Sequence, residues 1–168
     1  MDEVLGMRSR IGFPAAYLSE SVGSESTNRS FFADPNKLPV TGVDVTIAKR
    51  GNDEAIRLVA PIYDGKSTDS KTILARNGYG VGAINVHVKD NVPGTQHIVG
   101  LQFVFMKVTD KGFDTSDQYS SDWVGEKPLS GNGISIGPGD GRPVYGFWLR
   151  PGLTLNSIGL IVEADYKL

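Results

Sequence analysis

The sequence predicts an all-β domain, and three observations lead to this class. Turn-forming residues separate short apolar runs, since 21 Gly and 9 Pro occur among 168 residues. Within the runs, apolar and polar residues alternate with the period of two that a half-buried strand requires. No stretch free of Gly and Pro has the i, i+3, i+4, i+7 apolar spacing of an amphipathic helix. We therefore expect about eight to ten short strands in an antiparallel sandwich, barrel or prism.

Residues 1–30 differ from the rest of the chain and are predicted to form a flexible N-terminal arm or linker. Serine recurs at positions 19, 21, 24, 26 and 30, with Gly23 among them. Such a composition is typical of linkers, although a loosely ordered terminus would look the same. The domain itself is expected to span residues 31–168.

Four segments with alternating or continuous apolar character are predicted strands, at residues 40–48, 54–62, 80–88 and 98–108. In the second segment Ile56, Leu58, Ala60 and Ile62 are expected to share one face, with Arg57 on the other. The fourth segment is the longest apolar run, so we expect it at the centre of a sheet. Residues 109–133 are rich in Gly, Asp and Ser and are predicted to form the longest surface loop.

Residues 143–162 predict a hairpin whose two strands are apolar on both faces, which places it inside a sheet-on-sheet core. The connection is Arg150-Pro151-Gly152, where proline presets φ and glycine tolerates a positive φ. The second strand is expected to begin at Leu153.

The same hairpin resembles one in a known family. It reads Gly146-Phe147-Trp148-Leu149-Arg150-Pro151-Gly152, Leu153-Thr154, Leu155-Asn156-Ser157-Ile158-Gly159. In jacalin-related lectins the last hairpin reads Gly-Phe-His-Gly-Arg-Ser-Gly, two variable residues, then Leu-Asp-Ala-Ile-Gly, so the spacing matches without a gap. A weaker likeness extends over roughly residues 38–165, while the Gly-rich opening motif of the plant members is absent. The resemblance implies a jacalin-like β-prism of three antiparallel, Greek-key-like sheets.

The resemblance also implies a sugar-binding turn with the frame Gly-x-x-x-Asp, which here is Gly152-x-x-x-Asn156. In that family the sugar is held without metal by backbone amides and the Asp, often beside an aromatic ring. Asn156 offers one carbonyl acceptor and an NH₂ donor in place of a carboxylate, and Leu153 and Thr154 supply no ring. One interpretation is that Gly152, Leu153, Thr154 and Asn156 bind a glycan with weakened or altered specificity. The other is that Gly152 and Asn156 serve the turn alone.

A second candidate region contains several carboxylates with two aromatic residues among them. The carboxylates are Asp110, Asp114, Asp117 and Asp122, and the aromatic residues are Tyr119 and Trp123. Oxygen clusters suit Ca²⁺, but the spacing fits no EF-hand loop and Asp is a common turn former. We therefore predict no metal, and we expect Tyr119 and Trp123 to stack on carbohydrate. The alternative is that Trp123 anchors a loop to the core.

Composition and short motifs argue against several classes of protein, namely nucleic-acid-binding, membrane-spanning, disulfide-bonded and catalytic ones. The formal net charge is -2 with both signs scattered, so no basic stripe points to nucleic acid. No apolar run reaches the ~18 residues of a membrane span, no signal peptide is expected, and the absence of Cys excludes disulfides. His87 and His97 lie in no catalytic motif, so we expect no enzyme and no cofactor.

We therefore predict a non-catalytic binding domain, a jacalin-like lectin or lectin-derived module with carbohydrate as its partner. The alternative is a structural or assembly domain of a larger secreted or cell-surface protein, with homo-oligomers formed through sheet faces or the N-terminal arm.

Overall fold

The computed structural model describes residues 16–19, 21–23, 28–50, 52–67, 71–92 and 95–163. These residues contain thirteen strands and no helix, which confirms the all-β prediction. The strands are β1 (Ala16–Leu18), β2 (Val22–Gly23), β3 (Ser30–Ala33), β4 (Gly42–Arg50), β5 (Asp53–Ile62), β6 (Thr72–Leu74), β7 (Tyr79–Val92), β8 (Thr95–Thr109), β9 (Gly112–Ser120), β10 (Val124–Gly125), β11 (Ile134–Ile136), β12 (Val144–Arg150) and β13 (Ser157–Glu163). Within these ranges no helix has the length and apolarity of a membrane span.

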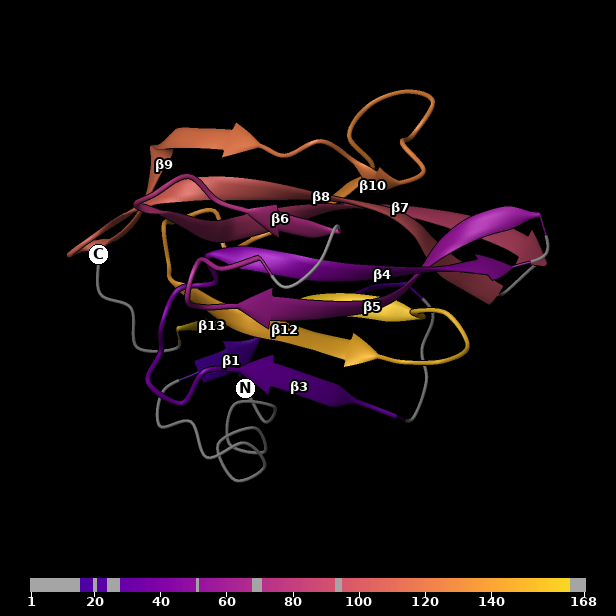
Figure 1. The fold of residues 1–168 in the computed structure, drawn as a ribbon, viewed down its shortest axis with the longest axis horizontal. Coiled ribbons are helices and arrows are strands. Elements are labelled where there is room, and N and C mark those ends of the chain that lie inside the picture. Colours follow the sequence, from indigo (N-terminus) through magenta and orange to yellow (C-terminus); the bar gives the residue numbers. More distant parts are fainter. Residues whose placement is uncertain are drawn as a thin grey trace.

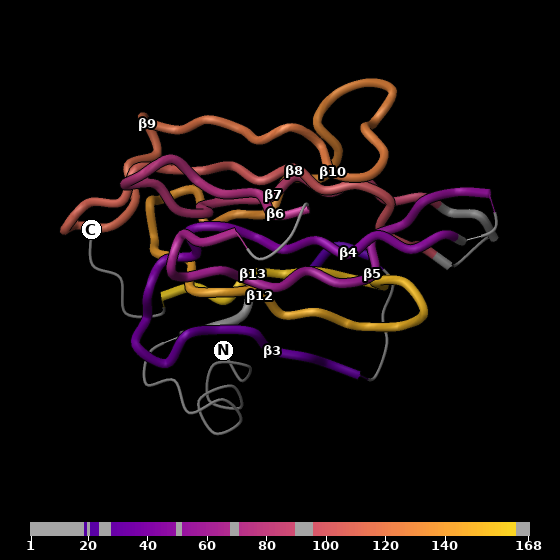
Figure 2. Tube along the Cα trace, in the orientation of Figure 1, coloured from indigo at the N-terminus to yellow at the C-terminus, as the bar shows by residue number. Residues whose placement is uncertain are grey.

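The strands form three antiparallel sheets (Figure 1). The terminal sheet has the order β1-β13-β12-β3, with β2 also paired to β13. The long sheet has the order β10-β8-β7-β11, with β9 also paired to β8, and the small sheet has the order β5-β4-β6. Strands from the two ends of the chain therefore lie side by side in the terminal sheet, as the trace of β3 beside β12 shows (Figure 2).

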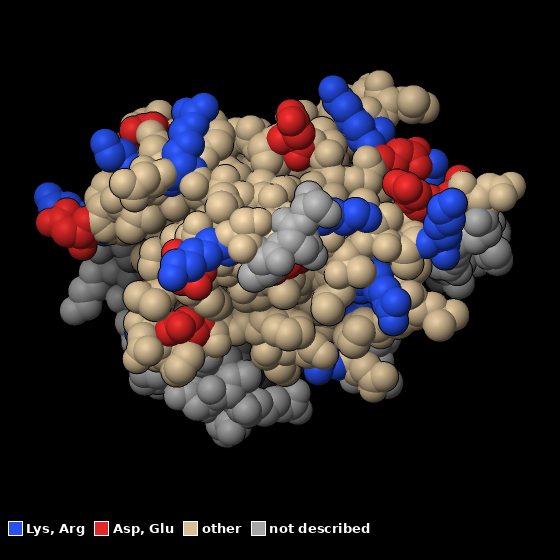
Figure 3. Space-filling view, viewed as in Figure 1, with Lys and Arg blue, Asp and Glu red and all other residues tan. Residues whose placement is uncertain are grey.

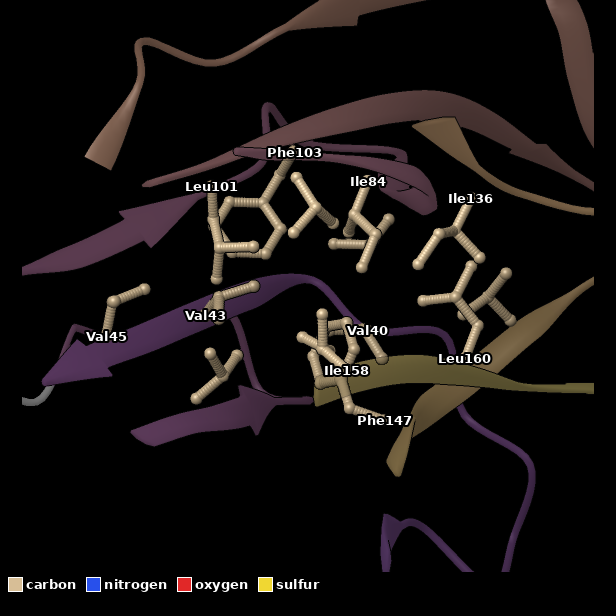
Figure 4. Packing of buried hydrophobic residues seen from close by; sticks show 14 of the residues in the cluster. Val40, Val43, Val45, Ile84, Leu101, Phe103, Ile136, Phe147, Ile158 and Leu160 are labelled. Atoms are coloured by element: carbon tan, nitrogen blue, oxygen red, sulfur yellow. The ribbon is translucent and has the colours of Figure 1, made fainter. Parts of the chain in front are cut away.

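One apolar core lies between the three sheets (Figure 4). Val43 from β4, Phe103 from β8 and Phe147 from β12 are 0 % exposed and belong to one cluster. Phe103 and Phe147 form a T-shaped ring contact with centroids 6.3 Å apart, which joins the long sheet to the terminal sheet. Since each sheet turns one face toward this core, the three-sheet architecture is the predicted one.

The predicted hairpin at residues 143–162 is confirmed as β12 and β13, which are paired from Val144↔Val162 to Arg150↔Ser157. All seven residues of β12 are buried, as expected for strands inside the core. The expected start of the second strand at Leu153 is wrong, because β13 begins at Ser157. Residues 151–156 form the connection instead, since Leu155 directs its backbone hydrogen bonds to other sheets.

The expectation of a long loop over residues 109–133 is also wrong. The segment contains β9, which pairs with β8, and β10, which also pairs with β8 at Leu101 and Gly100. Among the described strands β9 pairs only with β8, and most of its side chains reach solvent, so its composition is polar. The pairing shifts between Met106↔Gln118 and Lys107↔Asp114, which leaves residues 115–117 in a bulge that hides the period of two.

The expectation that Ile56, Leu58, Ala60 and Ile62 share one face of the second predicted strand is wrong, because this strand contains a bulge. Thr46 pairs with Leu58 and Ile47 pairs with Ile56, so Arg57 is an extra residue in β5. The face reverses at this point, because Ile56 and Val59 are 0 % exposed whereas Leu58 is 38 % exposed. The four apolar residues expected on one face are therefore divided between two faces.

The predicted domain boundary at residue 30 coincides with the first residue of β3, and it remains a prediction. Before this boundary, β1 and β2 pair with β13. Ser19 also contacts the sheet, because its Oγ accepts a hydrogen bond from the Leu160 N–H at 2.7 Å and its carbonyl accepts one from the Trp148 Nε1–H at 3.1 Å. Residues 1–15, 20 and 24–27 of the predicted arm lie outside the described residues.

Candidate functional site at the connection between β12 and β13

The connection is closed at its base by a cross-strand pair. Arg150, the last residue of β12, lies opposite Ser157, the first residue of β13. The Asn156 N–H donates to the Arg150 carbonyl at 3.0 Å, which ends the ladder and turns the chain. Six residues, 151–156, therefore project from the end of the hairpin; they appear beyond the arrowhead of β12 in Figure 1.

Leu155 anchors this connection to the rest of the molecule. Its side chain is 0 % exposed and belongs to the core cluster. Its N–H donates to the Ile56 carbonyl of β5 at 2.7 Å, and its carbonyl accepts from the Ile98 N–H of β8 at 3.3 Å. One residue thus ties the connection to both neighbouring sheets, so the residues around it are held in place before any ligand arrives.

Gly152 and Asn156 face each other across the connection. A Cβ on Gly152 would lie 2.8 Å from the Asn156 Nδ2 and 3.0 Å from the Thr154 carbonyl oxygen. The predicted reason for this glycine was a positive φ, but its φ is not in the left-handed region. Glycine is favoured at this position by lack of space instead, because a side chain at residue 152 would displace the Asn156 amide.

The connection presents hydrogen-bonding groups that the protein does not use. The described residues supply no hydrogen-bond partner for the backbone N–H groups of Gly152, Leu153 and Thr154, or for the side-chain amide of Asn156. Leu153 is 98 % exposed at the tip, whereas Thr154 is 4 % exposed. The exposed residues Gly152 and Leu153 therefore offer backbone donors, and Asn156 offers an amide that both donates and accepts, whereas the Thr154 N–H belongs to a buried residue.

Gly23 is a part of this site that the sequence did not predict. It lies in β2 opposite Ser157, with a φ of 122°, and a Cβ there would overlap the Asn156 carbonyl oxygen. The N-terminal segment therefore packs directly on the backbone of the candidate site. The available signal was a single glycine within a serine-rich stretch, which a linker explains equally well.

Arg150 and Trp148 lie on the same strand beside the connection. The Arg150 guanidinium carbon lies 5.2 Å from the centre of the Trp148 ring, and that of Arg29 lies 5.5 Å from it. Trp148 pairs with Gly159, and a Cβ on Gly159 would lie 2.6 Å from the indole Cε2, so the glycine makes room for the ring. Arg150 is only 9 % exposed.

Tyr119 lies in β9, and its recorded contacts belong to a different part of the fold. Its ring meets Tyr79 and Phe105, each at 5.3 Å, and carries the Arg76 guanidinium at 4.1 Å. Its hydroxyl accepts a hydrogen bond from the Arg76 N–H at 2.6 Å. These contacts share no residue with those of the connection, and β9 lies at the opposite end of the view in Figure 1.

Trp123 precedes β10 and is half-buried. Its neighbour Val124 pairs with Leu101 of β8, which places Trp123 on the long sheet rather than on the hairpin of the connection. The structure therefore groups Gly152, Leu153, Thr154 and Asn156 in one connection, whereas Tyr119 and Trp123 lie in or beside strands of the long sheet. Carbohydrate stacking by Tyr119 or Trp123 remains a prediction.

Two of the four acidic residues of the second candidate region, Asp114 and Asp117, accept hydrogen bonds from different partners. Asp114 accepts hydrogen bonds from the Ser116 hydroxyl and N–H within the bulge, which holds the pKa of its carboxyl below the ordinary value. Asp117 accepts a hydrogen bond from the Tyr79 hydroxyl at 2.7 Å, and this bond raises the pKa of Tyr79. Among the described residues, no three His, Cys, Asp or Glu side chains are grouped as metal ligands. On the face drawn in Figure 3, charged side chains of both signs are interspersed.

Comparison with known proteins identifies the fold. No protein-family model matches the chain, and no curated protein matches it. Among solved structures it is similar to the Calystegia sepium agglutinin, with 13 % identity over 90 % of this chain and 99 % of that one, at a TM-score of 0.58. It is also similar to a mannose-specific jacalin-related lectin from Morus nigra in complex with mannose, with 12 % identity over 90 % and 97 % of the two chains, at a TM-score of 0.54.

A third similar structure is a mannose-binding jacalin-related lectin from Ananas comosus, with 16 % identity over 88 % and 98 % of the chains and a TM-score of 0.52. The chain therefore has the β-prism fold of jacalin-related lectins, which confirms the predicted resemblance at the level of the fold.

Proposed function

We propose that this protein is a non-catalytic carbohydrate-binding module and that the connection Gly152–Asn156 is its binding site. The observation that carries the proposal is the set of unused hydrogen-bonding groups, the backbone N–H groups of Gly152 and Leu153 and the Asn156 amide, on a connection that Leu155 anchors to two sheets. Solved lectins with the same fold, including mannose-binding ones, support carbohydrate as the ligand class.

The specificity of this site is expected to differ from that of a site with a carboxylate. An ionised Asp accepts several charge-assisted hydrogen bonds from sugar hydroxyls, whereas the Asn156 side chain has one carbonyl acceptor. Loss of one charge-assisted bond weakens binding by about 1.5–3 kcal/mol. We therefore propose weakened binding of neutral sugars, or an altered preference among glycans.

A glycan array tests this function. Wild-type protein is expected to bind a defined set of glycans, and Gly152→Val is expected to abolish that binding because its side chain would displace the Asn156 amide. Asn156→Asp is expected to strengthen the binding of neutral glycans by roughly tenfold or more, since it restores a charged acceptor.

Asn132→Asp is the matched control, because it adds the same charge at an exposed residue between β10 and β11. It should leave binding unchanged. Absence of any glycan hit for both the wild type and Asn156→Asp at high protein density would refute the proposed function.

One observation favours an assembly domain as the second candidate. Leu153 is 98 % exposed at the tip of the connection, where an apolar side chain suits a protein contact. Under this alternative, light scattering would show an oligomer for the wild type and a lower mass for Leu153→Ser. An unchanged mass would remove this role from the connection.

A further inference from the structure

Arg150 is a buried cation that has no acidic partner among the described residues. It is 9 % exposed, and its Nε is shielded from solvent with no hydrogen-bond partner in the described structure. The ion pairs recorded for the described residues join Lys37–Glu163, Lys89–Glu126, Lys107–Asp117 and Arg142–Asp140, so none of them includes Arg150. A charge removed from water normally has a carboxylate or another anion beside it.

The neighbours of Arg150 attract a cation but accept no hydrogen bonds from it. The Trp148 ring lies 5.2 Å from the guanidinium carbon and supplies a cation–π contact. A guanidinium carries five N–H donors, and an aromatic face does not satisfy them. Ser157, directly opposite Arg150, is 0 % exposed and its Oγ also has no partner among the described residues. The Arg150 Nε and the Ser157 Oγ are therefore both buried without a hydrogen-bond partner among the described residues.

The backbone of this pair closes the base of the candidate binding site, and the Arg150 guanidinium lies over the Trp148 ring of the same strand. Arg150 and Ser157 flank the connection that carries the unused N–H groups of Gly152, Leu153 and Thr154. Residues 150–157 include no Asp or Glu, and the position of the expected carboxylate is the neutral Asn156. A second guanidinium, that of Arg29, lies 5.5 Å from the same Trp148 ring. Among the described residues, the connection and the pair that closes it thus combine several donors with the positive charge of Arg150.

From this arrangement we infer that the bound glycan carries an oxyanion, a carboxylate or a sulfate, and that Arg150 is the side chain that binds it. The inference rests on the proposed function, because it specifies the ligand class of the same site. A guanidinium presents parallel N–H groups that match the oxygens of a planar carboxylate or a sulfate. The Asn156 amide can donate to such a group, whereas a carboxylate at position 156 would repel it.

Matched glycan pairs test the inference on the full chain. Each pair is one saccharide with and without a terminal sialic acid, or with and without a sulfate ester, so the two arms separate carboxylate from sulfate. The wild type is expected to bind the acidic member of at least one pair roughly tenfold to hundredfold more tightly than the neutral member, the range of one charge-assisted contact. The acidic member should also be the one whose affinity falls with added salt.

Arg150→Met and Arg150→Lys separate the effect of the planar guanidinium, with its parallel N–H groups, from the effect of the positive charge. Met keeps an unbranched stem against Trp148 and should remove the preference for the acidic member. Arg150→Lys should retain part of this preference, because lysine keeps the positive charge but lacks the planar guanidinium. Lys111→Gln, which removes one positive charge in the turn between β8 and β9, should keep the full preference. Thermal melts establish that each variant is folded.

The outcomes distinguish the two proposals. Equal binding of acidic and neutral members by the wild type, without salt dependence, would overturn the oxyanion inference and leave carbohydrate binding intact. A folded Arg150→Met variant that retains the preference would also overturn it. Binding of neither member in any pair would refute the proposed function together with this inference.

Discussion

The hydroxyls of Tyr63 and Tyr145 become partly buried on folding. The Tyr63 hydroxyl connects the end of β5 in the small sheet to the terminal sheet. The Tyr63 hydroxyl, just after β5, donates to the Tyr145 carbonyl of β12 at 2.5 Å. The Tyr145 hydroxyl in turn donates to the Glu163 carboxylate, which pairs with Lys37 at 3.3 Å. Burial raises the pKa of Tyr63, and burial together with the Glu163 carboxylate raises the pKa of Tyr145.

These raised values predict a loss of stability in alkali. In the unfolded chain a tyrosine loses its proton near pH ~10, but in the folded protein Tyr63 and Tyr145 retain theirs to higher pH. Their contribution is therefore fully present below pH ~10 and is lost as the pH rises above it. Urea unfolding at several pH values should show the free energy of unfolding falling above pH ~10.

The double variant Tyr63→Phe/Tyr145→Phe should have a shallower alkaline slope than the wild type, although it is less stable at neutral pH because it loses two hydrogen bonds. An identical slope in both proteins would contradict the assignment to these hydroxyls.

Single residues also show where prediction from the sequence succeeded and failed. The replacement of the expected carboxylate by Asn156 is visible in the sequence because the hairpin resembles that of jacalin-related lectins, in which this position is Asp. The burial of Arg150 is not visible, because a basic residue before Pro-Gly looks like an exposed turn residue. Its environment depends on Trp148 and on Ser157 of the neighbouring strand.

At the scale of one element, the connection between β12 and β13 is stabilised from outside the hairpin. Its ladder ends at Arg150↔Ser157, and the next anchor is Leu155, which bonds to β5 and β8. The conformation of the connection is therefore expected to depend on core packing more than on its own turn residues.

Leu155→Ala tests this dependence, with Leu153→Ala as the matched control two residues away. Leu155 is 0 % exposed and Leu153 is 98 % exposed. We expect Leu155→Ala to lower the free energy of unfolding by about 2–5 kcal/mol through the cavity it leaves. Leu153→Ala should change it by less than about 0.5 kcal/mol. Urea unfolding of both variants provides the measurement, and equal effects would show that Leu155 is not the anchor.

Strands β5 and β9 show why element prediction was incomplete. Alternation predicts a strand at β5 correctly, but the extra residue Arg57 reverses the buried face part-way along it. Strand β9 has no clear alternation, because residues 115–117 bulge out and the remaining side chains lie at a sheet edge. Both features arise from pairing with a partner strand, which local sequence does not specify.

At the scale of the whole molecule, the terminal sheet closes the domain by joining its first strands to its last. Strands β1 and β2 pair with β13, and β3 pairs with β12. One face of each of the three sheets packs into a common core. No sheet buries its apolar face alone, so we expect the domain to unfold as one cooperative unit.

The two tryptophans allow a test, since Trp148 lies in the terminal sheet and Trp123 beside the long sheet. Trp123→Phe leaves Trp148 as the single tryptophan. In this variant, unfolding followed by fluorescence and by far-ultraviolet circular dichroism should have the same midpoint. An earlier fluorescence transition would mean that the terminal sheet separates from the rest of the core before global unfolding.

The sequence by itself determined the all-β class, the β12–β13 hairpin and the neutral residue at the candidate sugar-binding position. The class and the hairpin follow from local chemistry, since alternation and turn residues are properties of neighbours in the chain, whereas the candidate position follows from the resemblance to jacalin-related lectins. Only the tertiary structure decided that Gly23 packs on Asn156, that Leu155 anchors the connection, and that the Arg150 Nε is buried without a partner among the described residues. The physical reason is that each of these contacts joins separate strands, and their proximity is set by how the sheets close around one core.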